Sequence, residues 1–324
     1  MTPRLAWLRY AGPLTDAEID DAAGRYRAVV LQPWEFHAAR RLKAADPTCT
    51  VLAYKCLSSI RDYEPGPVFS SGVSPALAEH LGTAADVPEW RHYGGHRQQR
   101  VWDDTYQEAW VESVVAELEG GPFDGVMADN DVWDDYYGHG LDMTLVRAGL
   151  DRLLQRAGPA LEDIGKLLVP NIAESRRDPG RWARHAAFGG GLEECLIGWG
   201  TRDDGWLDVP DILAQFAELD HPGLIIARVP GDGLPTDSSL HLAVAAAYVF
   251  LPHRDVAVTA TTHDGYDAMP WIDIPDLGEP CSPVIDDPGG PGVFRRRFTR
   301  GEAWVNLGPA TAHLPGQAGH WWMD

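Results

Sequence analysis

Eight short apolar runs recur along the chain, and most are separated by a segment with helical periodicity. The runs cover residues 5–8, 28–31, 50–54, 125–128, 166–169, 192–196, 224–227 and 256–259. Segments with apolar residues at helical spacing cover residues 16–26, after Thr15 as a cap, and residues 106–118, 141–157, 210–219 and 240–250. Alternating strands and helices predict a parallel sheet with right-handed crossovers.

The number of repeats favours a closed barrel over an open sheet. Eight repeats within roughly 260 residues match the usual size of a (β/α)8 barrel. A doubly wound sheet normally carries a Gly-rich phosphate loop after its first strand, but residues 9–13 contain no such motif. The predicted fold class is therefore α/β, a (β/α)8 TIM barrel.

The pattern changes after the eighth run. Residues 293–298 and 302–306 read as two strands joined at residues 299–301, and residues 311–314 form a third apolar stretch. This segment is too short to bury a core of its own. We expect a barrel over residues 1–285 and a small β-hairpin appendage, packed on the barrel, over residues 286–324.

Charge and hydropathy exclude several classes of partner. The formal net charge of −21 disfavours nucleic acid and anionic membranes, which bind proteins through Lys and Arg. No run approaches the ~20 apolar residues of a membrane-spanning helix. The first ten residues are too charged for a signal peptide, so the expected localisation is cytoplasmic.

Polar residues gather at the ends of three consecutive predicted strands. They are Asp129, Asn130 and Asp131 after the fourth, Asn171 and Glu174 after the fifth, and Glu193 and Glu194 in the sixth. Because the carboxyl ends of barrel strands meet at one mouth, we expect these side chains to converge there. The long segment 57–104 leaves the same end of the barrel and is predicted to roof the site.

Two carboxyl groups at a barrel mouth suit hydrolysis of a glycosidic bond. One carboxyl protonates the leaving oxygen, and the other attacks the anomeric carbon or activates water. We select Asp129 as nucleophile or base and Glu194 as general acid. Neighbouring strand residues point to opposite faces, so Glu193 and Glu194 cannot both face the substrate, and Glu194 is nearer the strand end. Glu193 stays open as the alternative, Asp129 could instead cap a turn, and Glu194 could pair with Lys55.

Further polar and aromatic residues near the strand ends are candidates for binding sugar. Polar side chains can hydrogen-bond hydroxyl groups, and tryptophan faces can pack on sugar C–H groups, although the same residues could cap strands or neutralise acids. The candidates are Arg9, Gln32, Lys55, Asn130, Asp131, Trp133, Asn171, Glu193, Trp199 and Arg228. No cofactor motif is present, and no metal site is predicted because His92 and His96 flank a Gly-Gly loop without a ligand pattern.

Three of these segments, together with the tail, resemble a known group of enzymes. Residues 53–55, residues 124–130 and Glu194, with the tail at 295–298 and 304–306, look like barrel-type glycoside hydrolases. Those enzymes are distantly similar to endo-α-1,4-polygalactosaminidases and α-amylase-like barrels. The resemblance implies hydrolysis of O-glycosidic bonds in an oligosaccharide, polysaccharide or glycoconjugate, with Asp129 and Glu194 as the catalytic carboxylates.

Two other functions use the same barrel mouth. A carbohydrate-binding barrel without catalysis would keep the tryptophans and the cleft. A lyase or isomerase could use Lys55 as a base or as a Schiff-base amine.

Overall fold

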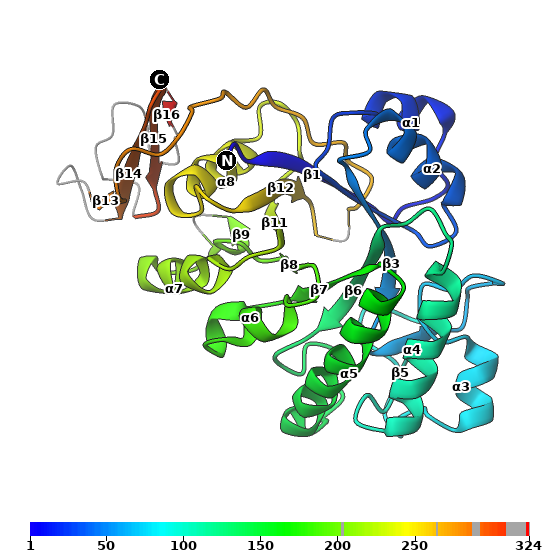
Figure 1. Ribbon diagram of the computed structural model, residues 1–324. Helices are drawn as coiled ribbons and strands as arrows, with labels where there is room; N and C mark the ends of the chain where they lie inside the picture. The colour runs from blue at the N-terminus through cyan, green and yellow to red at the C-terminus, as the bar shows by residue number, and fades with distance from the viewer. Residues whose placement is uncertain (202–203, 264, 287–291, 309–321, 324) are drawn as a thin grey trace.

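Eight parallel strands close into a barrel surrounded by helices (Figure 1). The computed structural model describes residues 1–201, 204–263, 265–286, 292–308 and 322–323. The barrel strands are β1 (Arg4–Arg9), β2 (Ala28–Leu31), β3 (Thr50–Cys56), β6 (Gly125–Asp131), β7 (Leu167–Ile172), β8 (Gly190–Glu193), β11 (Leu224–Pro230) and β12 (Asp255–Thr261). Each of the eight predicted barrel strands is present, and the predicted barrel is confirmed.

The sixth barrel strand, β8, begins and ends earlier than its apolar run suggested. It starts on glycines because a Cβ on Gly190 would collide with the backbone carbonyl of Leu224 on the neighbouring strand. Glycine has no side chain that could extend the apolar run, so the sequence does not show that this strand begins at Gly190. As a result, Glu193 is the last strand residue and Glu194 follows the strand.

Alternate residues of the strands fill the barrel interior, as the two-residue period of a strand requires. One buried cluster contains Leu8, Val30, Leu52, Met127 and Leu192, which all belong to this interior set. The intervening strand residues belong to a larger cluster that includes the surrounding helices. In β6 the alternation is interrupted between Ala128 and Asp131, where Asn130 takes a left-handed conformation with φ of 72°.

The helices lie outside the barrel. They are α1 (Asp16–Ala22), α2 (Phe36–Ala45), α3 (Pro75–Leu81), α4 (Asp104–Leu118), α5 (Met143–Asp163), α6 (Arg181–His185), α7 (Val209–Leu219) and α8 (Ser238–Phe250). Each helix predicted from the sequence is present, and Thr15 caps α1 with a capping box. The prediction missed α2, α3 and α6. Both α2 and α6 lack a side-chain cap, and α6 is very short.

Two small antiparallel sheets of two strands each extend from the barrel. Strands β4 (Ser59–Arg61) and β5 (His96–Gln98) pair within the long segment that follows β3. Strands β9 (Gly198–Thr201) and β10 (Asp204–Trp206) pair after β8. Their position brings both small sheets to the carboxyl ends of the barrel strands.

The C-terminal sheet packs on one barrel helix. Its order is β13 (Ile285–Asp286), β14 (Val293–Phe298), β15 (Gly301–Asn306) and β16 (Trp322–Met323), and it stands beside α8 in Figure 1. Tyr248 of α8 meets Phe298 edge-on at 5.4 Å, and Phe250 meets Phe294 at 5.3 Å. The predicted β appendage is confirmed, whereas its expected third stretch at 311–314 lies outside the described residues.

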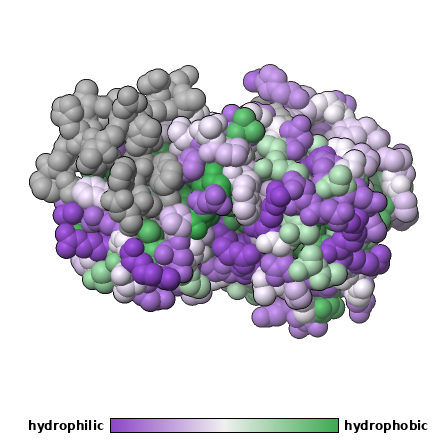
Figure 2. Space-filling view, turned by 90° about the horizontal axis from the view of Figure 1, so that it is seen from above, coloured by the Kyte–Doolittle hydropathy of each residue, from purple (hydrophilic) through white to green (hydrophobic). Residues whose placement is uncertain are grey.

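Hydrophilic residues cover much of the face that Figure 2 shows outside its grey region. Within the described part of the chain, no helix is both long enough and apolar enough to cross a membrane.

Candidate active site

A cavity of about 830 Å³ opens at the carboxyl ends of the barrel strands. Its walls include Tyr10 after β1, Gln32 after β2, Tyr54 of β3, Asn171 of β7 and Glu194 after β8. Barrels of this kind carry their active sites at this end. The volume of the cavity is typical of pockets that bind small-molecule ligands.

Asp129 lies at the centre of a hydrogen-bond network in this cavity. Its Oδ2 accepts from the Tyr54 hydroxyl at 2.5 Å and from the Asn130 amide at 3.1 Å. Its Oδ1 accepts from the Asn130 backbone N–H at 2.9 Å and from Asn171 Nδ2 at 2.8 Å. The orientation of the Asp129 carboxylate is therefore fixed from several sides.

Glu194 shares one of these donors. Asn171 Nδ2 donates to Glu194 Oε2 at 2.8 Å as well as to Asp129, and the Tyr266 hydroxyl donates to Glu194 Oε1 at 3.0 Å. Since both bonds from the same nitrogen are 2.8 Å long, the two acceptor oxygens lie within twice that distance, 5.6 Å, of each other. The structure thus brings together the two carboxylates that the sequence selected.

The surroundings of Glu194 favour its protonated form. Burial and the negative charge of Asp129 raise the pKa of Glu194 above its ordinary value, against the opposing effect of the Asn171 hydrogen bond. A raised pKa favours the protonated form, which a general acid must have.

Arg61 acts on Asp129 through the hydroxyl group of Tyr54. Arg61 Nη2 donates to the Tyr54 oxygen at 2.7 Å, while the Tyr54 hydroxyl donates to Asp129. The guanidinium carbon also lies 4.9 Å from the centre of the Tyr54 ring. A cation at the far side of Tyr54 strengthens that hydroxyl as a donor, because charge-assisted hydrogen bonds polarise their neighbours.

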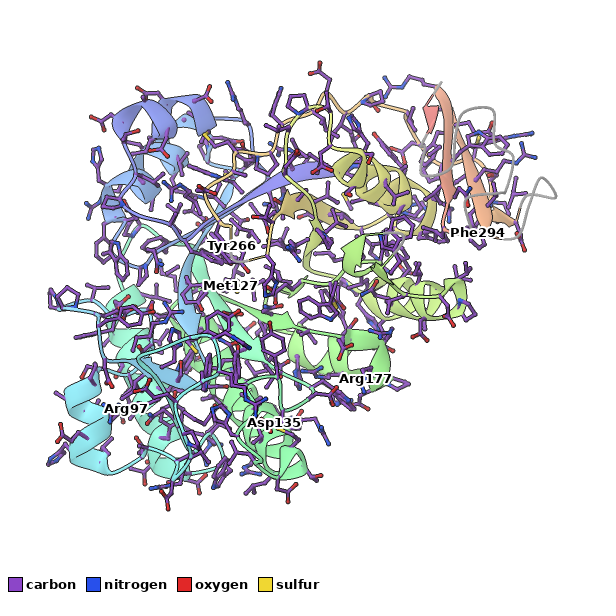
Figure 3. All side chains as sticks on the ribbon, turned by 180° about the vertical axis from the view of Figure 1, so that it is seen from behind. Arg97, Met127, Asp135, Arg177, Tyr266 and Phe294 are labelled. Atoms are coloured by element: carbon purple, nitrogen blue, oxygen red, sulfur yellow. The ribbon has the colours of Figure 1, made fainter. Side chains whose placement is uncertain are left out.

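Aromatic rings form much of the cavity wall. Trp90 from the long segment after β3 stacks on Tyr137 with ring centres 3.5 Å apart, and Tyr93 meets Tyr137 edge-on. Tyr266, from the loop after β12, packs against the interior cluster that contains Met127 (Figure 3). Stacked rings of this kind present flat apolar surfaces of the sort that bind the C–H faces of sugars.

The outer rim of the cavity is charged. Arg177 pairs with Glu174 at 2.7 Å and also contacts Asp134, and all three residues line the cavity with Asp135. Asp135 and Arg177 are labelled in Figure 3. Among the described residues, no three His, Cys, Asp or Glu side chains gather closely enough to hold a metal ion.

Seven of the predicted site residues line the cavity. They are Gln32, Asp129, Asn130, Trp133, Asn171, Glu194 and Trp199. Five others do not line it: Arg9, Lys55, Asp131, Glu193 and Arg228.

Arg9, Lys55 and Glu193 point away from the barrel interior because they occupy the outward positions of their strands. Arg9 bonds Glu18 of α1 at 3.1 Å, and Lys55 pairs with Glu117 of α4 at 2.7 Å. Glu193 accepts from the Ser175 hydroxyl at 2.7 Å. The suggested ion pair between Lys55 and Glu194 is therefore wrong.

Asp131 and Arg228 are held in buried contacts. Asp131 pairs with Arg181 at 2.9 Å and with His185 at 2.6 Å. Burial alone would raise the pKa of Asp131, but these two cations lower it to about 2. Arg228 donates to the Thr261 hydroxyl at 2.9 Å and to its backbone carbonyl at 2.7 Å. Neither side chain is placed to touch a sugar in the cavity.

Sequence reasoning missed several residues that line the cavity: Tyr10, Tyr54, Arg61, Trp90, Tyr137 and Tyr266. Strand alternation could have found Tyr10 and Tyr54, since each lies two positions beyond an interior residue, Leu8 or Leu52. The other four come from loops or from the small β4–β5 sheet, whose course no periodicity predicts. The long segment 57–104 does line the cavity, through Arg61 and Trp90 among others.

The fold is a TIM barrel with a cavity at the carboxyl ends of its strands, and solved structures of glycoside hydrolases share this fold. AmyB, a maltogenic α-amylase from Thermotoga neapolitana, has a TM-score of 0.58 and 10% identity over 94% of this chain and 86% of its own. The glycoside hydrolase domain of PelA from Pseudomonas aeruginosa has a TM-score of 0.53 and 15% identity over 84% of this chain and 100% of that domain. At these identities the likeness is one of fold.

The family is set by sequence. Residues 43–302 match the model of hypothetical glycosyl hydrolase family 15, and the chain belongs to that family. No curated protein sequence matches the chain. The protein is thus a glycoside hydrolase with a carbohydrate substrate, as the sequence predicted.

Family membership and the position of Lys55 also bear on the alternative functions. The family is one of glycosyl hydrolases, which favours hydrolysis over a barrel that only binds sugar. A lyase using Lys55 would need that amine in the cavity, and no lysine is found among the described residues that line it.

Proposed function

We propose that the protein hydrolyses O-glycosidic bonds with retention of anomeric configuration, using Asp129 as nucleophile and Glu194 as general acid and base. The observation that carries this proposal is the shared Asn171 amide, which keeps Asp129 Oδ1 and Glu194 Oε2 within 5.6 Å of each other. Retaining enzymes hold their carboxyl groups ~5–5.5 Å apart, while inverting enzymes leave roughly 6.5–9.5 Å for a water molecule.

The first step transfers the sugar to the protein. An Asp129 oxygen attacks the anomeric carbon and forms a glycosyl ester, while the bond from that carbon to the leaving oxygen breaks. Glu194 gives its proton to the leaving oxygen, which departs as an alcohol. The raised pKa of Glu194 supplies the protonated acid that this step needs.

The second step releases the sugar. The ionised Glu194 takes a proton from water, the resulting hydroxide oxygen bonds to the anomeric carbon, and the ester bond to Asp129 breaks. Each displacement inverts the anomeric carbon, because Asp129 attacks from one face and water then attacks from the opposite face, so the two steps together restore the original configuration. Because Glu194 has given up its proton in the first step, it can act as the base in the second, and one residue serves in both steps.

Asp129→Asn and Glu194→Gln test the assignment on a panel of 4-nitrophenyl α- and β-glycosides of glucose, galactose, glucosamine and galactosamine. We expect kcat to fall at least ~10²-fold for either variant, since a positioned acid or base contributes 10²–10⁴-fold. Glu193→Gln is the matched control, because Glu193 is the adjacent carboxylate outside the cavity. It should keep activity even if its melting temperature falls.

The configuration of the first product decides the stereochemistry. ¹H NMR during early turnover should show the same anomer as the substrate. A 2-deoxy-2-fluoro glycosyl fluoride should leave its sugar on a peptide that contains Asp129. An inverted first product would contradict the retaining mechanism, and full activity of Asp129→Asn would contradict the assignment of the nucleophile.

A further inference from the structure

Tyr10 lies between the two tyrosines that hold the carboxylates. Its ring centre is 4.7 Å from that of Tyr54 and 4.5 Å from that of Tyr266. Tyr54 donates its hydroxyl to Asp129, and Tyr266 donates its hydroxyl to Glu194. Tyr10 is therefore the middle of three tyrosine rings, and the hydroxyl groups of the outer two both donate to carboxylates of the protein.

The position of Tyr10 is fixed by its backbone and its ring. It follows the last residue of β1, its backbone carbonyl accepts from Gln32 Nε2 at 2.8 Å, and its ring packs against the interior cluster. Such support from backbone and neighbours holds a side chain in one place before a ligand arrives.

The Tyr10 hydroxyl differs from its neighbours in having no protein partner. Tyr10 lines the cavity, and no group within the described part of the chain exchanges a hydrogen bond with its hydroxyl. Burial, and then the charges of Asp129 and Glu194, raise the pKa of Tyr10, so the hydroxyl keeps its proton. A protonated phenol without a partner is an available donor beside the two carboxylates.

We propose that the Tyr10 hydroxyl donates a hydrogen bond to a hydroxyl oxygen of the sugar residue that lies between Asp129 and Glu194. The inference rests on the proposed function, because it places the reacting sugar between those carboxylates. Both carboxylates already accept hydrogen bonds from protein donors, so the pocket floor is rich in acceptors and Tyr10 supplies a donor that sugar oxygens can use. Tyr10 becomes a substrate contact at the point of reaction.

Tyr10→Phe removes the hydroxyl and keeps the ring that stacks on Tyr54 and Tyr266. We expect kcat/KM to fall about fivefold, since a neutral hydrogen bond contributes about 1 kcal/mol and 1.4 kcal/mol is a factor of ten. The assay uses the 4-nitrophenyl glycoside of the panel that the parent cleaves fastest. Tyr26→Phe is the matched control, because Tyr26 also has an unpartnered hydroxyl but stacks on Trp7 at 5.7 Å, away from the cavity.

A pH profile separates substrate contact from indirect positioning. If Tyr10 touches the sugar, kcat/KM falls by the same factor at every pH and the limbs of the profile stay in place. If Tyr10 acts only by changing the pKa of Glu194, Tyr10→Phe shifts the alkaline limb of the kcat/KM profile, and the proposal is overturned. Tyr266→Phe gives the reference for such a shift, because it removes a hydrogen bond that lowers the pKa of Glu194.

Monodeoxy versions of the same glycoside locate the partner. The parent should lose activity on one deoxy sugar that Tyr10→Phe handles as well as the complete sugar, since the bond is already gone. Equal losses in both proteins at every position, or Tyr10→Phe activity within twofold of the parent, would overturn the proposal. Those results would leave the proposed function intact as long as Asp129→Asn is inactive, whereas an active Asp129→Asn would remove the basis of both.

Discussion

Replacing Asn171 by alanine removes an amide that bonds both carboxylates. Asn171 is only 5% exposed, and its Nδ2 donates at 2.8 Å to Asp129 and to Glu194. Hydrogen bonds to charged groups contribute roughly 1.5–3 kcal/mol each. If the transition state loses one such bond in full, kcat/KM falls by roughly 10- to 150-fold.

The same variant should change the pH dependence in a defined direction. The Asn171 hydrogen bond lowers the pKa of Glu194, so its loss raises that pKa further. Glu194 must be protonated to act as the acid, and activity is lost as the pH rises through its pKa. The alkaline limb of kcat/KM should therefore move to higher pH in Asn171→Ala.

The assay is steady-state hydrolysis of the best 4-nitrophenyl glycoside over a range of pH, with thermal unfolding to check that the variant is folded. A folded Asn171→Ala protein with the parent kcat/KM and the parent alkaline limb would refute the idea that this amide couples the carboxylates. A lower rate with an unmoved limb would mean that Asn171 orients Asp129 without tuning Glu194.

Three further predictions concern residues around the site. Lys55→Met should lower the melting temperature by breaking the buried pair with Glu117, at a cost of roughly 3 kcal/mol, and should leave kcat/KM unchanged; borohydride reduction should trap no sugar on Lys55. Trp199→Ala should raise KM roughly three- to tenfold with little change in kcat, since Trp199 is an exposed ring on the cavity wall, and an unchanged KM would exclude it as a sugar contact. Asp131 raises the pKa of His185 to about 9, although burial opposes this, so the free energy of unfolding should fall by on the order of 3 kcal/mol as the pH rises from about 6.5 through 9. Urea unfolding should show that His185→Gln lacks this fall, and an equal fall in both proteins would contradict it.

The barrel could be predicted because its strands are buried on both faces. Such strands read as continuous apolar runs, and their order with intervening helices limits the topology to few choices. The strand start at Gly190 and the uncapped helix α2 could not be predicted, because neither has an apolar run or a capping residue that marks it in the sequence. Packing against the rest of the protein stabilises them instead.

Some residues of the candidate site were predicted correctly and others were not, and strand alternation explains much of this difference. Asp129, Asn171 and Glu194 occupy interior positions of their strands or follow them in phase, as Met127, Val169 and Leu192 show. Lys55 and Arg9 are one residue out of phase, and a one-residue shift turns a side chain to the other face. The neighbours Tyr54 and Tyr10 were the residues in phase. Applying the period to every strand would have exchanged two wrong choices for two cavity residues.

Asp131 shows where that rule stops. It is two positions beyond Asp129 and should share its face, yet it is buried against Arg181 and His185. The reason is Asn130, whose left-handed φ of 72° interrupts the strand between the two acids and lets its side chain bond Asp129, Cys56 and Tyr137. A strained residue of this kind is characteristic of functional sites, and here it turns one carboxylate toward the cavity and the next toward a structural ion pair. Three polar residues in a row therefore have three different roles, which their sequence alone did not distinguish.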